Sequence, residues 1–221
     1  MLNMDFSKRV LIHTPDQEWQ ASPMPGVWRK PLAREEKEQG HATSIVKYDA
    51  GSSFSEHDHP RGEEIFVLEG TFSDQTGDYG KGQYFRNPKG FRHAPFSKHG
   101  CVILVKLHQF QTEDKAHVLI NTQNTQWQQG HGKLKVMPLH THLTESTALV
   151  FWPASSTFQS HTHFGGEEIF VIRGELIDEF GCYPEGTWLR NPHASRHNPY
   201  AMVDTLIWVK TGHLQDRSIF V

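Results

Sequence analysis

The sequence predicts an all-β protein that consists of two tandem domains of the same fold. Three observations support this prediction: an internal repeat that covers most of the chain, short apolar segments separated by turns, and a group of histidines that recurs at constant spacing. The chain has 221 residues, a length that allows one large domain or two domains of about 100 residues each.

The repeat becomes visible when the sequence is compared with itself at an offset of 104 residues. Between 42–106 and 146–210, 27 of 65 aligned positions are identical without a gap. Upstream the offset becomes 108, where VLIHTPDQEWQ at 10–20 aligns with VLINTQNTQWQ at 118–128. A unit of about 100 residues is too long for a solenoid repeat and has the size of a duplicated domain. We therefore expect an N-terminal domain over 1–112 and a C-terminal domain over 113–221.

Short apolar runs predict the strands of each domain. They lie at 43–48, 65–68 and 101–107 in the first repeat, and at 147–152, 169–172 and 205–209 in the second. The runs are rich in branched aliphatic and aromatic residues, and turns that contain Gly or Pro separate them. Many short strands of this kind are typical of a sandwich or barrel. The charged segment LAREEKEQG at 32–40 is expected to form a solvated turn or one short helix.

Composition excludes several classes of function. The net charge of −3 offers no basic surplus for binding nucleic acid. The longest aliphatic run near the N-terminus, VLI at 10–12, is too short for a signal peptide or a membrane span. The two cysteines, Cys101 and Cys182, occupy non-equivalent positions of the repeat, so we expect reduced thiols and a cytoplasmic protein without a membrane partner.

The recurring histidines form a pattern of metal-ligand type. His57 and His59 are two residues apart, a spacing that places both side chains on one face of a strand. Together with a glutamate and a later histidine they give two equivalent sets: His57, His59, Glu63 and His93, and His161, His163, Glu167 and His197. Three imidazoles and one carboxylate close a four-coordinate Zn site, or fill four positions of an octahedral Fe, Mn or Ni site. We expect a divalent metal, with Zn as the first choice.

The spacing of these residues resembles the two sequence motifs of the cupin family. The first motif is matched by Gly51 and HDHPRGEEIFVLEG at 57–70, and the second by GQYFRNPKGFRH at 82–93. The fuller string, through HAPFSKHGC at 93–101, is similar to the cupin domain of ChrR-type anti-sigma factors. The resemblance implies two double-stranded β-helix (jelly-roll) barrels in tandem, a bicupin, with a metal inside each barrel.

The sequence also departs from the family pattern. Ser97 and Ala201 stand where many cupins have Asn, and the second copy has Ser155 and Ala194 in place of two motif glycines. ChrR-type proteins carry a separate sigma-factor-binding domain with a His-x₃-Cys-x₂-Cys zinc motif. This chain contains no Cys-x₂-Cys, so we expect the sensor half without the part that binds a sigma factor.

Other repeated residues suggest roles around the two sites. The arginine pairs Arg86/Arg190 and Arg92/Arg196 are either structural partners of Glu64 and Glu168 and rim charges, which we favour, or groups that position an anionic ligand. Lys106 and Lys210 lie within apolar strands, and we expect each to be paired, with Glu64 and Glu168 as candidate partners.

Cys101 is either a redox sensor near the first site or, as we favour, a buried and inert thiol. Phe91 is replaced by Ser195 in the second copy, which predicts that the two pockets differ.

Three functions are consistent with these observations. The first is a regulatory module that senses reactive oxygen or a small ligand through its metal, as the ChrR resemblance implies. The second is a metal-dependent dioxygenase of the acetylacetone-cleaving cupin type. The third is a scaffold with a structural metal. The expected partner is a small molecule, and a homodimer is one alternative for the assembly; the fold alone does not decide, because cupins host many functions.

Overall fold

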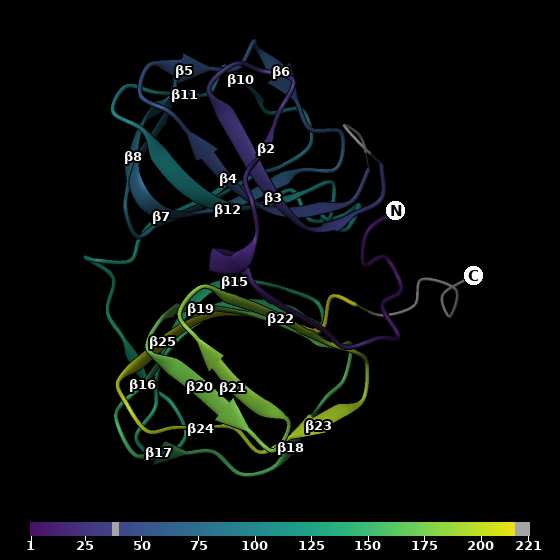
Figure 1. Cartoon of the computed structure of the whole chain (residues 1–221), viewed down its shortest axis with the longest axis vertical. Coiled ribbons are helices and arrows are strands. Elements are labelled where there is room, and N and C mark those ends of the chain that lie inside the picture. The colour runs from purple at the N-terminus through teal and green to yellow at the C-terminus, as the bar shows by residue number, and fades with distance from the viewer. Residues whose placement is uncertain (37–39, 215–221) are drawn as a thin grey trace. The chain divides into compact units, whose positions relative to one another are not determined.

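The computed structural model describes residues 1–36 and 40–214. These residues form two compact units. The N-terminal unit comprises residues 1–4 and 17–125, and the C-terminal unit comprises residues 5–16 and 126 onward. The predicted all-β fold is confirmed, since the named elements are antiparallel strands and one 3₁₀ turn (Figure 1). Within the described ranges, no helix has the length and apolar character that crossing a membrane requires.

The N-terminal unit is built on one large sheet with the strand order β13-β9-β7-β12-β4-β3-β2, to which β5, β8 and β11 are attached. A separate ribbon pairs β6 with β10. The bounds are β2 (Gln20–Ala21), β3 (Val27–Arg34), β4 (Ala42–Tyr48), β5 (Ser52–Ser53), β6 (His57–Asp58), β7 (Glu63–Asp74), β8 (Gly77–Gly80), β9 (Gln83–Asn87), β10 (Arg92–His93), β11 (Phe96–Ser97), β12 (Cys101–Leu107) and β13 (Val118–Asn121).

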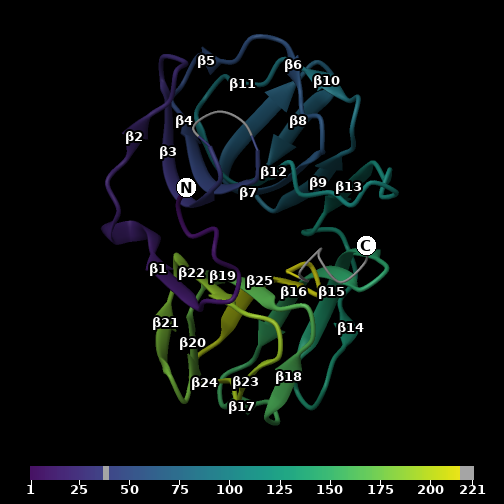
Figure 2. The same ribbon diagram turned by 90° about the vertical axis from the view of Figure 1, so that its right-hand side faces the viewer.

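The C-terminal unit repeats this plan with the strand order β1-β22-β19-β25-β16-β15-β14 in its main sheet. A second sheet has the order β17-β24-β20-β21, and a ribbon pairs β18 with β23 (Figure 2). The bounds are β1 (Val10–His13), η1 (Thr14–Asp16), β14 (Gln128–Gln129), β15 (Lys135–His142), β16 (Glu145–Trp152), β17 (Ser156–Thr157), β18 (His161–His163), β19 (Glu167–Arg173), β20 (Glu175–Asp178), β21 (Gly181–Pro184), β22 (Thr187–Asn191), β23 (Ser195–His197), β24 (Tyr200–Ala201) and β25 (Thr205–Thr211).

Each unit is completed by the first strand of the other sequence repeat. β1 belongs to the first repeat but pairs with β22, with Ile12 opposite Trp188. Its counterpart β13 belongs to the second repeat but pairs with β9, with Ile120 opposite Tyr84. The compact units therefore depart from the division 1–112 and 113–221 at two segments, 5–16 and 113–125. The two repeats exchange strands within one chain.

The core of each unit lies between its strands, as expected for a jelly roll. In the C-terminal unit, Leu176 and Tyr183 of the second sheet pack with Ile169 and Ile207 of the main sheet. In the N-terminal unit, the core is more aromatic, and the Phe72 ring lies 5.6 Å from Phe85 and 5.7 Å from Tyr48 between centroids. The predicted apolar runs supply these core strands.

A sharp bend follows the segment that carries the first motif in each repeat. Gly70 has φ +67°, and a Cβ at this position would collide with the Gly100 carbonyl oxygen. Gly174 has φ +84°, and its Cβ would lie 2.5 Å from the Asp204 carbonyl oxygen. Only glycine fits such a close approach of two backbones, so these motif glycines are fixed by packing.

The structure corrects the expectation for 32–40 and refines the expectations for two departures from the motif. Val27–Arg34 is a strand in which Leu32 and Ala33 are buried, so the start of 32–40 is neither a turn nor a helix, and 37–39 lie outside the described residues. Ser155 and Ala194, which replace motif glycines, retain the left-handed conformation, with φ +59° and +60°. The turns at these two positions therefore keep a glycine-like geometry.

Arg86 and Lys210 have acidic partners, and Lys106 Nζ donates to the Thr43 hydroxyl at 3.1 Å. Arg86 Nη1 lies 3.5 Å from Glu64 Oε2, and the same guanidinium binds Asp114. Lys210 Nζ lies 2.5 Å from Glu145 Oε1. Lys210 therefore pairs with a glutamate on the neighbouring strand β16 that the sequence did not single out, in addition to its position opposite Glu168 in the register.

The strand exchange predicts a position-specific effect of adding one methyl group. Gly186 and Gly51 both have φ +82°, but a Cβ on Gly186 would lie 2.8 Å from Pro15 Cδ, whereas a Cβ on Gly51 would meet nothing within 4 Å. Gly51→Ala should cost only the backbone strain, about 1–2 kcal/mol. Gly186→Ala should cost about 1–3 kcal/mol more, because the added methyl group would push the exchanged segment away. Urea unfolding of the two variants measures the difference, and equal costs would contradict the docking of residues 5–16 on β22.

Candidate metal centres

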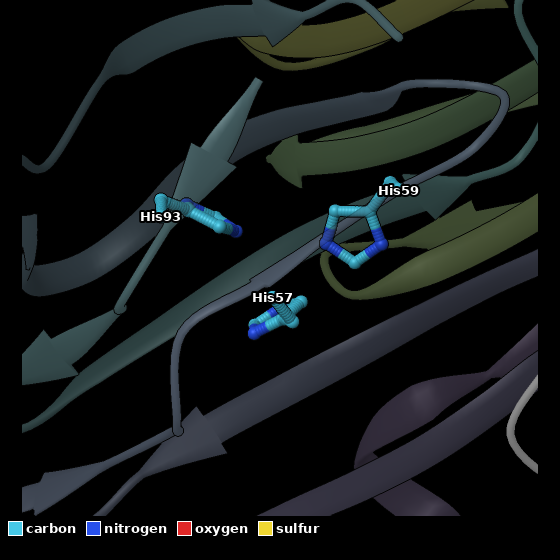
Figure 3. Close-up of side chains that lie close together, drawn as sticks. All are labelled: His57, His59 and His93. Carbon is cyan, nitrogen blue, oxygen red and sulfur yellow. The ribbon is translucent and has the colours of Figure 1, made fainter. Parts of the chain in front are cut away.

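β6 and β10 bring three histidines of the N-terminal unit together. The two strands pair antiparallel, and His57 lies directly opposite His93 in the register. His59 follows two residues after His57 and leaves the chain on the same side. The ring centroids of the three residues are 4.8 to 5.6 Å apart, and Figure 3 shows the rings around a common space.

The C-terminal unit builds the same arrangement from β18 and β23. His161 lies opposite His197, and His163 lies two residues further along β18. The ring centroids are 4.4 to 5.0 Å apart. In each unit, the three imidazoles offer ligand atoms that all lie within 4.8 Å of one another. Both groups can therefore hold a metal ion.

A glutamate at the start of the next strand joins each group. Glu63 Oε1 lies 3.3 Å from His59 Nε2, and Glu63 Oε2 lies 3.5 Å from His93 Nε2. Asn87 donates its side-chain N–H to Glu63 at 3.1 Å, which fixes the carboxylate. In the C-terminal unit, Glu167 lies 3.4 Å from His163 and 3.6 Å from His197, and Asn191 donates to it at 3.0 Å.

The hydrogen bonds of the histidines leave suitable nitrogens for a metal. His57 Nδ1 lies 2.7 Å from the Ser55 carbonyl oxygen, and His161 Nδ1 lies 3.0 Å from the Gln159 carbonyl oxygen. Each Nδ1 is therefore the donor, which leaves a lone pair on Nε2. The Nε2 atoms of His59 and His93 are buried and face the Glu63 carboxylate at 3.3 and 3.5 Å, in a geometry that does not make a hydrogen bond. These nitrogens and the glutamate form a donor set that fits a divalent metal, which would supply Lewis-acid chemistry and, for Fe or Mn, redox chemistry.

Two aspartates that the sequence analysis did not select support the last histidine of each set. His93 Nδ1 lies 3.4 Å from Asp74 Oδ2, and His197 Nδ1 lies 3.2 Å from Asp178 Oδ2. A carboxylate behind a ligating imidazole holds its ring and tautomer. Asp74 and Asp178 are identical at the 104-residue offset, and this identity is the signal that could have revealed them.

The exchanged N-terminal segment reaches the outer layer of the C-terminal centre. Arg9 Nε donates to Asn191 Oδ1 at 3.1 Å, and Arg9 Nη2 donates to the Tyr183 hydroxyl. Tyr183 in turn donates to Asp178, and the Arg9 guanidinium lies 3.9 Å from Asp178 Oδ2. Arg9 therefore contacts the supports of both Glu167 and His197. His117 takes the position of Arg9 at the 108-residue offset, and its ring stacks on Phe91 at 5.2 Å.

The electrostatics of the two centres differ. Burial would raise the pKa of Glu63, but the neighbouring His59 and His93 lower it to about 2. Burial and the neighbouring His161 lower the pKa of His163 to about 3, so this imidazole is neutral. Burial raises the pKa of Glu167 above its ordinary value, because the compensating charge comes from one histidine rather than two.

The pKa of the last histidine of each centre, His93 or His197, is raised rather than lowered. Burial opposes its charged form, but nearby carboxylates raise the pKa of His93, through Glu63 and Asp74, and of His197, through Asp178 and Glu167. Burial lowers the pKa of His57 and His161. The last histidine is therefore the position at which protons compete most strongly with a metal.

A cavity of about 230 Å³ adjoins the C-terminal centre. His161, His163, Glu167 and His197 form one part of its wall, and apolar side chains that include Trp152, Leu176 and Ile207 form the rest. A metal held by the four polar side chains would border this cavity.

The four arginine candidates interact with groups other than the proposed metal ligands, whereas Phe91 lies beside His93. Arg92 is exposed and lies 3.4 Å from Glu56, and Arg196 donates to Ser160 at 2.8 Å. Arg190 is buried and donates to the Asp5 carbonyl oxygen at 3.0 Å. Arg86 binds Glu64 and Asp114, as described above. Cys101 is buried, and burial raises the pKa of its thiol to about 11. The Phe91 ring lies 5.8 Å from the His93 ring at the edge of the N-terminal centre.

Comparisons with solved structures show the same fold. A proposed dioxygenase from Nostoc punctiforme is 14% identical, with a TM-score of 0.76 over 96% of this chain and 85% of that chain. The YlbA protein of Escherichia coli is 14% identical, with a TM-score of 0.72 over 98% and 94%. Oxalate decarboxylase of Bacillus subtilis, described with Mn(II) centres, is 13% identical, with a TM-score of 0.65 over 93% and 78%. A comparison with curated proteins gives no match.

Two jelly-roll units, each with a histidine group inside, define a tandem bicupin. The family model for the ChrR cupin-like domain matches the chain twice, over residues 7–111 and 115–215. The protein belongs to this family, and the resemblance inferred from the sequence motifs is confirmed.

We expect Arg9 to control the metal affinity of the C-terminal centre. Arg9→Met removes the donor to Asn191 and Tyr183, and loss of a group that orients metal ligands typically weakens metal binding by about 10–100-fold. Competition between the protein and a zinc indicator dye measures this change. Lys8→Met is the matched control, because Lys8 lies next to Arg9 and its ion pair with Asp5 is exposed. Equal zinc affinities of the two variants would show that Arg9 does not act on the centre.

The two thiols should react differently. Cys101 is buried with a pKa of about 11, whereas Cys182 is exposed. Below pH 11 the Cys101 thiol is protonated and unreactive, so a colorimetric thiol reagent at pH 8 should titrate one thiol per native chain and two after unfolding. Cys182→Ser should abolish the native reaction. Rapid reaction of Cys101 in the native Cys182→Ser variant would restore the redox-sensor interpretation.

Proposed function

We propose that the protein is a metal-binding regulatory bicupin that responds to a small ligand or to reactive oxygen through its C-terminal centre. The observation that carries this proposal is the cavity that adjoins His161, His163, Glu167 and His197. A structural metal needs no adjoining cavity, whereas a responsive one needs space beside it for a second molecule. Zn is the resident metal that we favour, and the same donors suit Fe, Mn and Ni.

The burial of Cys101 supports a response through the metal centre rather than through this thiol. A cysteine sensor requires an accessible thiolate, and Cys101 is buried with a raised pKa. The histidine centres recur in both units, whereas Thr205 takes the place of Cys101 in the C-terminal unit. We therefore assign the sensing role to the metal ligands. The family resemblance favours the control of transcription as the output of this sensing.

Metal removal should lower the stability of the folded protein. A metal that binds only the folded state at 100 times its Kd stabilises that state by about 2.7 kcal/mol. Protons compete for the imidazoles, first at His93 and His197, whose pKa values are raised above the ordinary histidine value of about 6.5, so this stabilisation begins to fall above pH 6.5 and is lost as the pH falls further. Thermal melting with and without a chelator at pH 7.5 and pH 5.5 measures both effects. Chelator should lower Tm at pH 7.5 and have little effect at pH 5.5; equal melting curves under all four conditions would contradict a metal-binding function.

A metal-dependent dioxygenase is the second candidate, and the same cavity favours it because an oxygenase needs its substrate beside the metal. Oxygen uptake by the iron-reconstituted protein in the presence of small β-diketones tests this candidate. The regulatory proposal expects no turnover. Turnover that His161→Ala abolishes and His57→Ala retains would overturn that proposal and identify the C-terminal centre as an active site.

A further inference from the structure

The two units differ in the size of a side chain beside the metal centre, at the place where the C-terminal cavity lies. Leu176 lines the cavity, and the equivalent residue of the N-terminal unit is Phe72. The Phe72 ring lies 6.3 Å from the His93 ring and 5.6 Å from the Phe85 ring, so an aromatic cluster lies beside that centre. In the C-terminal unit, the smaller leucine leaves this space to the cavity. Leu176 therefore leaves more room beside the C-terminal histidines than Phe72 leaves beside the N-terminal ones.

The charge of the cavity wall restricts the ligand. Among the described residues that line the cavity, none is lysine or arginine, and Glu167 is the acidic one. A divalent metal beside the Glu167 carboxylate would leave one net positive charge at the centre. One negative charge on a ligand balances it, whereas a second would lie in an apolar environment without a partner, at a high desolvation cost.

The size and shape of the wall restrict the rest of the ligand. The cavity volume of about 230 Å³ is below the roughly 300–1,000 Å³ of pockets that take drug-sized molecules. Away from the histidine centre, most of the wall is apolar, and Thr211 adds one hydroxyl where the N-terminal unit has Leu107. His131 also lines the cavity and is exposed, so the cavity reaches the surface at this residue.

We infer that the C-terminal centre binds a small monoanion with one oxygen-bearing head group, a carboxylate or an enolate, and a hydrocarbon body that fills the cavity beside Leu176. This inference rests on the proposed function, because it takes a metal at the C-terminal centre as given. Dicarboxylates of similar length are disfavoured, because the described residues of the wall include no lysine or arginine to pair with their second charge. The N-terminal centre does not take such a ligand, because Phe72 occupies the corresponding space.

The test uses the full chain loaded with Co²⁺, whose visible absorption reports on the environment of the metal. Hexanoate is the monoanion probe, and glutarate is a dianion of similar length. Hexanoate should change the cobalt spectrum with a Kd at least 10-fold lower than that of glutarate. Equal or tighter binding of glutarate would overturn the inference, and this comparison does not depend on any variant.

Two reciprocal substitutions between the units test whether hexanoate binds in the C-terminal unit. Leu176→Phe introduces the residue of the N-terminal unit and should weaken hexanoate binding at least 10-fold while cobalt affinity stays close to that of the wild type. The reciprocal variant, Phe72→Leu, should leave hexanoate binding at the C-terminal centre unchanged. Hexanoate binding that survives Leu176→Phe would contradict the assignment to the cavity.

Cobalt content separates a failure of this inference from a failure of the proposed function. If wild type and His161→Ala bind the same amount of cobalt, the C-terminal centre holds no metal, and both proposals are wrong. If His161→Ala loses one cobalt but hexanoate leaves the wild-type spectrum unchanged, the metal centre stands and the ligand class is wrong.

Discussion

The antiparallel pairing of two short strands in each unit is the constraint on which both centres depend. The register of β6 with β10 sets His57 opposite His93, and that of β18 with β23 sets His161 opposite His197. The pleat then adds a third imidazole two residues along. Four polar groups converge at each place, partly or wholly buried, and a shift of the register by one residue would turn them to the other face. We propose that a divalent metal is the partner that offsets this convergence.

The two centres share this frame but differ in what surrounds it. In the N-terminal unit, Phe72 and its aromatic neighbours lie beside the histidines. In the C-terminal unit, Leu176 leaves a cavity, and Arg9 from the exchanged segment binds Asn191 and Tyr183. After the duplication, both centres thus kept the same ligands, while the packing around one of the two centres changed. We interpret the C-terminal centre as the responsive one and the N-terminal centre as the more structural one.

The sequence predicted the fold from the repeat and the short apolar runs, and it grouped the three histidines that the structure brings together in each unit. Period-2 alternation places His57 and His59 together, and the repeat shows that His93 and Glu63 accompany them. The exchange of β1 and β13 was not predictable, since the sequences VLIH and VLIN are nearly identical and do not distinguish one unit from the other. Arg9 was missed because no local sequence pattern connects it with Asn191, which lies 182 residues further along the chain. The cavity was anticipated only as a difference between pockets, since its volume depends on packing in three dimensions.

The central claim is that each unit holds one metal through its own histidines. Elemental analysis of the full chain, purified without added metal and compared with His57→Ala and His161→Ala, tests this claim most directly. The account predicts two bound divalent ions per chain in the wild type and one in each variant. A metal content that neither substitution lowers, or a wild-type chain that binds no divalent metal even when it is supplied, would contradict the account.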